Sequence, residues 1–415
     1  MSKVPLSERK HIAFVGKRNV GKSSLVNCFV GQDLVIVSDI PGTTTDPVKK
    51  AMELLPFGPI VIIDTAGIDD ISELGEKRVN KTMQIISETD FAIVVLDSQS
   101  HLSNEEMNLI ELLNKYEIPF YIAINKSELG INYKLLEELN FRKLSFSLVS
   151  CKTGKGIYEF KEKIANLIPN EEEPPLISDL IKQHDIIVLV VPIDLGAPKG
   201  RLILPQVQTI RESLDEDAVV IVVKDKELRS ALSILNQKPK LVVTDSQAIM
   251  RVNADVPDDI KVTTFSILMA RHKGDLTEYI KGLQRIEELQ NGDKVLIAEA
   301  CSHHPQEDDI GKVKIPRWLR LHTKKNLEIS FSNGHYFPSN LSDFKLIIHC
   351  GGCMLNRKAM LTRIKQAKFA NVPIVNYGLA ISYMHGALPR ALEPFPEAKQ
   401  VWELFQKKIP SFHQL

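Results

Sequence analysis

Cysteine is scarce in this chain, with only five among 415 residues. A small, odd number of thiols excludes the disulfide framework that holds small secreted domains together. The simpler prediction is a reducing, cytoplasmic setting in which the thiols stay free for metal binding or chemistry.

The chain also lacks an excess of charge and any long apolar run. Lysine plus arginine equals aspartate plus glutamate, 52 each. This balance argues against nucleic acid or an anionic membrane as the principal partner, because both attract basic surfaces. The run from Ile186 to Val191 is strand-sized and far short of a membrane span. The first residues contain no apolar core of signal-peptide length, so we expect neither a leader nor a membrane segment.

What is present is an alternation of short apolar runs with helical patterns. Buried parallel strands appear in a sequence as continuous apolar runs, so an α/β fold with mainly parallel sheets is predicted. We expect a first domain over 1–168 and an acidic, proline-containing linker over 169–180. Two smaller α/β domains are expected over 181–266 and 267–415.

A glycine-rich turn follows the first apolar strand and opens a helical pattern. It fits G-x-x-x-x-G-K-S from Gly16 to Ser23. In such a loop Gly16 and Gly21 let backbone N–H groups close around phosphate oxygens. Lys22 reaches the β and γ phosphates, and the Ser23 hydroxyl coordinates Mg²⁺. The full motif in this context predicts a P-loop rather than a merely structural turn.

Three further segments occur in the order that small GTPases use. "DTAG" ends one strand with Asp64 for the Mg²⁺ shell and Gly67 for the γ-phosphate; "NKSE" resembles the guanine-reading N-K-x-D signature, and "SCK" resembles S-A-K. With "PGTTTDP" and "SELGEKRVNKT", the block resembles the TrmE–Era–EngA group of GTPases, which implies GTP or GDP with Mg²⁺. The nucleotide-binding residues expected from this resemblance are Gly16, Asn19, Val20, Gly21, Lys22, Ser23, Ser24, Asp64, Asn125, Lys126, Glu128, Ser150, Cys151 and Lys152.

Several positions bear on the rate and selectivity of this GTPase. Glu128 stands where the family has aspartate, which adds a methylene to the guanine-reading carboxylate; GTP is still expected over ATP. Thr44 is the candidate switch threonine for Mg²⁺, with Thr43 as the neighbouring alternative. Ile68 cannot orient water, so hydrolysis must be assisted otherwise. Asn19 matches the asparagine that binds K⁺ in TrmE-like GTPases, although a loop asparagine also has ordinary turn uses.

We therefore expect slow, K⁺-stimulated GTP hydrolysis. The catalytic residues expected are Lys22, Ser23, Thr44, Asp64 and Gly67.

Three of the five cysteines follow strand-like runs of the last block. Cys301 and His303 follow "DKVLIAEA"; His349, Cys350 and Cys353 end or follow "FKLIIH". If these strands are parallel neighbours, both segments lie at one sheet edge, where ligand sites form. The residue types fit a tetrahedral zinc site, a 4Fe–4S cluster with one iron lacking a thiolate, or a dithiol of two cysteines. Buried small residues without a ligand are the plainest alternative.

The order C-x-H, 45 residues, then H-C-x-x-C, behind a TrmE–Era-type GTPase, resembles the HydF family of FeFe-hydrogenase maturation GTPases. The resemblance implies a 4Fe–4S cluster on Cys301, Cys350 and Cys353. It makes His303 and His349 candidates for the fourth ligand or for a neighbour that orients a ligand. It also assigns dimerisation to the middle domain.

The same resemblance implies a GTP-hydrolysing scaffold that works as a homodimer. It would hold a diiron subcluster precursor made by radical-SAM maturases and deliver it to apo FeFe-hydrogenase, with no nucleic acid or membrane partner. One alternative is a TrmE- or EngA-like RNA or ribosome-associated GTPase with an accessory zinc domain. Another is a redox-sensing GTPase in which Cys350 and Cys353 form a disulfide.

Overall fold

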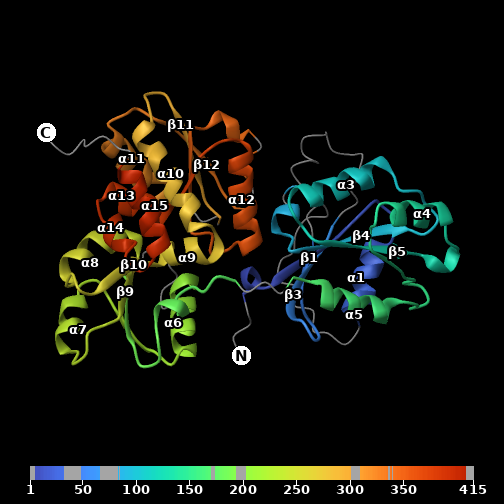
Figure 1. Cartoon of the computed structure of the whole chain (residues 1–415), viewed down its shortest axis with the longest axis horizontal. Coiled ribbons are helices and arrows are strands. Elements are labelled where there is room, and N and C mark those ends of the chain that lie inside the picture. Colours follow the sequence, from blue (N-terminus) through green and yellow to red (C-terminus); the bar gives the residue numbers. More distant parts are fainter. Residues whose placement is uncertain are drawn as a thin grey trace. The chain divides into compact units, whose positions relative to one another are not determined.

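The structure is a computed structural model that describes residues 5–31, 48–65, 83, 85–169, 173–192, 202–300, 309–334, 337–338 and 340–407. The chain divides into two compact units, Met1–Glu172 and Glu173–Leu415. Figure 1 shows the elements of each unit, which are described separately below.

The first unit is a six-stranded sheet with helices on both faces (Figure 1). The strand order is β2-β3-β1-β4-β5-β6, and among the described pairs only β2 with β3 is antiparallel. One face packs against α1 and α5, and the other against α3 and α4. The strands are β1 (Lys10–Val15), β2 (Val48–Leu54), β3 (Gly58–Asp64), β4 (Phe91–Asp97), β5 (Phe120–Asn125) and β6 (Phe146–Leu148). The helices are α1 (Lys22–Val30), α3 (Asn104–Lys115), α4 (Tyr133–Phe141) and α5 (Ile157–Leu167), with a short 3-10 turn η2 (Ser127–Leu129).

The central strands are buried on both faces, as their continuous apolar runs predict. Every residue of β4 except its last, Asp97, is buried. Helix α3 begins at a polar cap, where Ser103 and Glu106 form a reciprocal capping box. Because β3, β1, β4 and β5 run parallel, the polar residues at the ends of β3, β4 and β5 lie at one edge of the sheet. This is the edge where α/β proteins bind ligands.

The second unit contains two four-stranded sheets, and all their described pairs are parallel. The strand orders are β10-β9-β7-β8 and β12-β11-β13-β14. The first sheet comprises β7 (Ile186–Val190), β8 (Val219–Val223), β9 (Leu241–Thr244) and β10 (Lys261–Thr264). The second comprises β11 (Lys294–Ala298), β12 (Glu328–Ser332), β13 (Leu346–His349) and β14 (Ile374–Asn376).

One hydrophobic core joins the two sheets of this unit. It includes Ile187 and Leu189 of β7 together with Ile297 of β11 and Ile348 of β13. The helices of this unit are α6 (Leu204–Asp215), α7 (Leu228–Ile234), α8 (Ile249–Asp255), α9 (Phe265–Lys273), α10 (Leu276–Glu288), α11 (Ile315–Thr323), α12 (Arg357–Phe369), α13 (Tyr377–Met384), α14 (Leu388–Ala391) and α15 (Pro396–Gln406).

The predicted α/β class with mainly parallel sheets is confirmed. The second and third predicted blocks share one hydrophobic core and form one compact unit. The predicted domain boundaries at 168, 180 and 266 stay predictions. In the part of the chain that the structure describes, no helix combines the length and apolar character needed to cross a membrane.

Candidate functional site

The turn between β1 and α1 requires glycine at two of its positions. Gly16 has φ +148° and Gly21 has φ +91°, in the region where residues with a Cβ are strained. A Cβ on Gly16 would lie 2.4 Å from the backbone oxygen of Val95, and one on Gly21 would lie 2.3 Å from Nδ2 of Asn125. The loop is therefore packed directly against the ends of neighbouring strands.

The side chain of Lys22 bonds back to the backbone of this loop. Its side chain is buried, and its Nζ donates hydrogen bonds to the backbone oxygens of Gly16 at 3.0 Å and Lys17 at 2.5 Å. The ammonium thus lies across the turn, while Ser23 and Ser24 are exposed in the first turn of α1. A cation beside a helix N-terminus is an arrangement suited to phosphate groups.

Asp64 ends β3 at the same sheet edge. Its Oδ1 is buried and has no hydrogen-bond partner among the described residues. A buried carboxylate oxygen of this kind is a hard ligand suited to Mg²⁺. Thr43, Thr44, Gly67 and Ile68 lie outside the described residues, so their predicted roles stay predictions.

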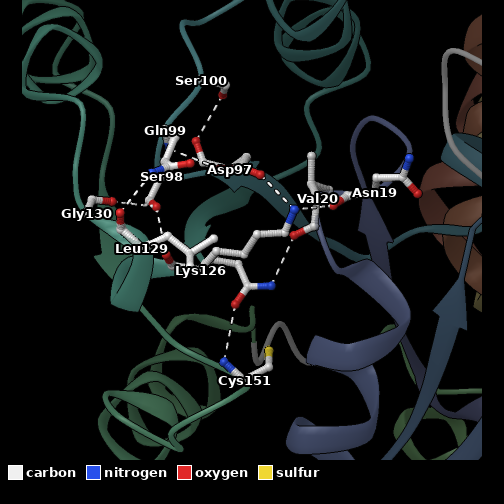
Figure 2. Close-up of polar contacts among 11 residues, drawn as sticks. Asn19, Val20, Asp97, Ser98, Gln99, Ser100, Lys126, Leu129, Gly130 and Cys151 are labelled. Atoms are coloured by element: carbon white, nitrogen blue, oxygen red, sulfur yellow. Dashed lines mark hydrogen bonds and ion pairs between the residues drawn. The ribbon is translucent and has the colours of Figure 1, made fainter.

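Asn125, the last residue of β5, connects two loops. It is only 2% exposed; its Nδ2 donates to the backbone oxygen of Val20 at 3.0 Å, and its Oδ1 accepts from the backbone N–H of Cys151 at 3.3 Å. In Figure 2, the dashed lines that reach Val20 and Cys151 from the unlabelled side chain are these two hydrogen bonds of Asn125. Asn125, which is expected to bind guanine, therefore also links the P-loop to the loop after β6 through two hydrogen bonds.

Lys126 forms a second link, between the P-loop and the end of β4. Its backbone is left-handed, with φ +64°, and its Nζ donates to the backbone oxygen of Asn19 and to Oδ2 of Asp97 at 2.7 Å (Figure 2). The Oγ of Ser98, which is fully buried, hydrogen-bonds the backbone oxygens of Lys126 at 2.9 Å and Gly130 at 2.8 Å. Asp97 and Ser98 were not predicted as site residues. Their only sequence signal is that they end and follow a buried strand.

Glu128 lies on η2 and is exposed. A hydrogen bond from the Ser150 side chain lowers the pKa of its carboxyl group, so the carboxylate form is favoured. Ser150 is fully buried, and its Oγ accepts from the backbone N–H of Thr153 at 3.1 Å. Lys152 is exposed on the same turn. The structure thus brings the "NKSE" and "SCK" segments into contact, and their role as a guanine pocket stays a prediction.

The two cysteines of the first unit lie close to each other. The Sγ of Cys28 donates to the backbone oxygen of Cys151 at 3.6 Å. Burial, with the Cys28 thiol beside it, raises the pKa of the Cys151 thiol to about 12. Cys151 is therefore held as a neutral thiol and contributes its backbone N–H rather than its sulfur to the site.

The cysteine segments of the second unit follow strands that are parallel neighbours. β11 pairs with β13 in parallel, so both strands end at the same edge. The backbone N–H of Ala300 donates to Sγ of Cys350 at 3.1 Å. Cys301, the next residue in the sequence, and His303 lie outside the described residues. The expected neighbourhood of the two segments is thus confirmed up to Ala300.

His349 is fully buried at the end of β13, with both ring nitrogens in contact. Nε2 lies 2.6 Å from Nη1 of Arg363, and Nδ1 lies 2.7 Å from the backbone oxygen of Cys350. Because arginine only donates, Nε2 is assigned as the acceptor and Nδ1–H as the donor. Burial, assisted by Arg363, lowers the pKa of this imidazole to about 3. The geometry supports a role in orienting Cys350; direct metal ligation would require one of these contacts to break.

Three family models match successive parts of the chain. A 50S ribosome-binding GTPase model matches residues 11–126, a hydrogen maturase F dimerization domain matches 176–274, and a hydrogen maturase F tetramerization domain matches 277–394. The first match confirms that the first unit is a P-loop GTPase domain.

Curated relatives match only in part. The tRNA modification GTPase MnmE of Heliobacterium modesticaldum is 35% identical over 172 residues, 40% of this chain and 36% of that protein. GTPase Der of Clostridium acetobutylicum is 34% identical over 173 residues, 38% of this chain and 39% of that protein. The chain spans little more than a third of the length of these relatives.

Solved structures show the same partial likeness. The G domain of the T. maritima FeoB iron transporter is 26% identical with a TM-score of 0.30, covering 39% of this chain and 100% of that one. Aquifex aeolicus Era is 19% identical with a TM-score of 0.33, covering 60% of this chain and 98% of that one.

The two hydrogen maturase F models are adjacent, follow the GTPase match in the chain, and together cover more than half of it. The predicted resemblance is confirmed: this chain belongs to the hydrogen maturase F (HydF) family, whose members join a GTPase domain to these two domains.

Proposed function

We propose that this protein is a GTP-hydrolysing scaffold that binds a 4Fe–4S cluster, holds a diiron subcluster precursor and delivers it to apo FeFe-hydrogenase. The observation that carries the proposal is the Ala300 N–H···Sγ contact with Cys350, because it brings the segment that leads to Cys301 beside one of the other two cysteines. The alternative of an RNA or ribosome-associated GTPase with a zinc domain is not favoured, since both models behind the GTPase domain are hydrogen maturase F models.

The nucleotide part rests on the geometry at the edge of the first sheet. Lys22 and the first turn of α1 would hold the β and γ phosphates, with Ser23 and Asp64 on Mg²⁺. Asn125, Lys126 and Glu128 would bind the guanine base. Slow turnover and stimulation by K⁺ at Asn19 are part of the proposal.

The cluster part rests on the chemistry of the donor set. Cys301, Cys350 and Cys353 would supply three thiolates, and the backbone N–H of Ala300 already donates to one of the sulfurs. When bound, a cluster with three protein thiolates supplies an iron that can accept an atom of another group. His303 and His349 are retained as the fourth ligand or as residues that orient one.

Self-association is supported by the matched dimerization domain and by one exposed strand. β8 is at the edge of its sheet, and its residues Val219 and Val222 are 49% and 45% exposed. An apolar edge strand offers unpaired backbone groups to a second chain. We propose a homodimer built on residues 176–274, with radical-SAM maturases and apo-hydrogenase as its further partners.

The proposal is tested by anaerobic purification, metal and sulfide analysis, and GTPase assays on matched variants. Wild type should contain iron and sulfide, hydrolyse GTP and activate apo-hydrogenase after loading. Cys350→Ser should lose the visible absorption of the cluster and the activation step but keep hydrolysis. Lys22→Ala should lose hydrolysis but keep iron.

The control is Cys28→Ser, which removes a thiol of the first unit and should keep both properties. Zinc in place of iron in the wild type, or full iron in Cys350→Ser, would overturn the cluster assignment. Loss of iron from Lys22→Ala would show that the two sites are not separable.

A further inference from the structure

Two cationic side chains are buried beside the segment His349–Leu355, which carries Cys350 and Cys353. Lys273 is 1% exposed and Arg363 is 3% exposed. Removing a charge from water is costly unless hydrogen bonds and an opposite charge compensate for it. Lys273 and Arg363 therefore place two buried positive charges beside one short segment.

Lys273 holds the C-terminal end of this segment. It is the last residue of α9, and its Nζ donates to the backbone oxygens of Leu355 at 2.9 Å and Cys353 at 3.3 Å. The ammonium thus contacts the backbone of a predicted cluster ligand directly. A glutamine or methionine of similar length would fill the same volume without the charge.

Arg363, in α12, holds the N-terminal end. Its Nη1 lies 2.6 Å from Nε2 of His349, and its Nη2 donates to the backbone oxygen of Gly334 at 2.7 Å. The guanidinium also lies 5.1 Å from the ring centroid of Phe337. Through His349, which contacts the backbone oxygen of Cys350, Arg363 fixes the strand end that bears this cysteine.

We propose that Lys273 and Arg363 are positioning residues that clamp the cysteine segment and supply the positive charge that balances an anionic cluster. The inference rests on the proposed cluster function and deepens it. A cluster held by three thiolates is an anion, and adding one electron from a reductant such as dithionite makes it more negative without forming or breaking a bond. A fixed positive charge in a low-dielectric interior therefore stabilises the reduced state of the cluster more than its oxidised state.

The test measures the reduction potential of the reconstituted cluster, together with its iron content. Lys273→Met should keep its iron and shift the potential to more negative values. A tenfold smaller equilibrium constant for reduction corresponds to about 59 mV. Lys273→Arg, which keeps the charge, should have a potential close to that of wild type. The matched control is Lys368→Met, which removes an exposed lysine that pairs with Glu278 at 2.9 Å and should leave the potential unchanged.

A Lys273→Met protein that retains its iron and has the potential of the Lys368→Met control would overturn the proposal. Arg363→Gln, which keeps hydrogen-bond donors without the charge, should shift the potential in the same direction and serves as the second variant if Lys273→Met does not fold. Iron retained in Cys350→Ser overturns the cluster assignment itself, so the two failures are distinguishable.

Discussion

Replacing Asn125 with alanine should destabilise the first unit even when no nucleotide is present. A residue that only read the guanine base would affect binding alone. In the structure, however, Asn125 is buried and bonded to Val20 on one side and to Cys151 on the other. The substitution therefore removes the two hydrogen bonds that link the P-loop to the loop after β6.

The size of the effect follows from these two contacts. Each hydrogen bond contributes about 1 kcal/mol net, and a buried group left without a partner costs about 1–3 kcal/mol. Because the Val20 oxygen and the Cys151 N–H both lose their partner, we expect the free energy of unfolding of the first unit to fall by about 3 kcal/mol.

The assay can use the full chain because its two tryptophans, Trp318 and Trp402, both belong to the second unit. Urea unfolding in EDTA, without nucleotide, is followed by far-UV circular dichroism and by tryptophan fluorescence. Asn125→Ala should move the dichroism transition of the first unit and leave the fluorescence transition in place. The control is Asn132→Ala, which removes a helix cap from α4 and should cost about 1 kcal/mol without affecting nucleotide affinity.

A nucleotide-free Asn125→Ala protein whose dichroism transition matches that of wild type would refute the structural role of this side chain. A fluorescence transition that moved by the same amount would show that the effect does not arise at these two hydrogen bonds.

Three shorter predictions follow from other contacts. Gly21→Ala should lower nucleotide affinity at least tenfold in equilibrium binding, because a left-handed backbone with a Cβ costs about 1–2 kcal/mol and the new atom would meet Asn125. Ser98→Ala should weaken GDP binding about tenfold by freeing the backbone of Lys126, a loss worth about 1.4 kcal/mol. His349 stays neutral when folded, with a pKa of about 3, whereas the unfolded chain binds a proton below about pH 6.5, so stability is lost as pH falls. In the metal-free protein, monitored by tryptophan fluorescence, the free energy of unfolding should fall by about 2 kcal/mol between about pH 7 and pH 5. His349→Gln should abolish this pH-dependent loss.

The sequence predicted the buried strands well because short, continuous apolar runs between turn residues are typical of strands covered on both faces. It did not predict β2, β10 or β12. The burial of β2 and β12 is partial, and their residues include charged and polar side chains, such as Lys49 and Lys50 in β2. β10 has only four residues, of which one is a lysine and two are threonines. These strands take their structure from the neighbour they pair with rather than from their own composition.

The same contrast applies to the sites. The P-loop, "NKSE", "SCK" and cysteine segments were recognisable because each has a fixed spacing. Asp97 and Lys273 had no such spacing. A lysine at the end of a helical pattern is ordinarily a solvated residue, and only tertiary packing shows that Lys273 is buried.

The contacts of the first unit also bear on how selectivity and phosphate binding are related. Asn125 and Lys126 are the expected guanine-reading residues, yet both donate to backbone oxygens of the P-loop, at Val20 and Asn19. A base that fits poorly would disturb these side chains, and the disturbance would reach the phosphate-binding loop directly. Glu128, the residue expected to bind guanine through its carboxylate, lies on an exposed turn, and its carboxyl group contacts Ser150 rather than the P-loop. We therefore expect the longer side chain of Glu128 to disturb the P-loop less than a substitution at Asn125 would.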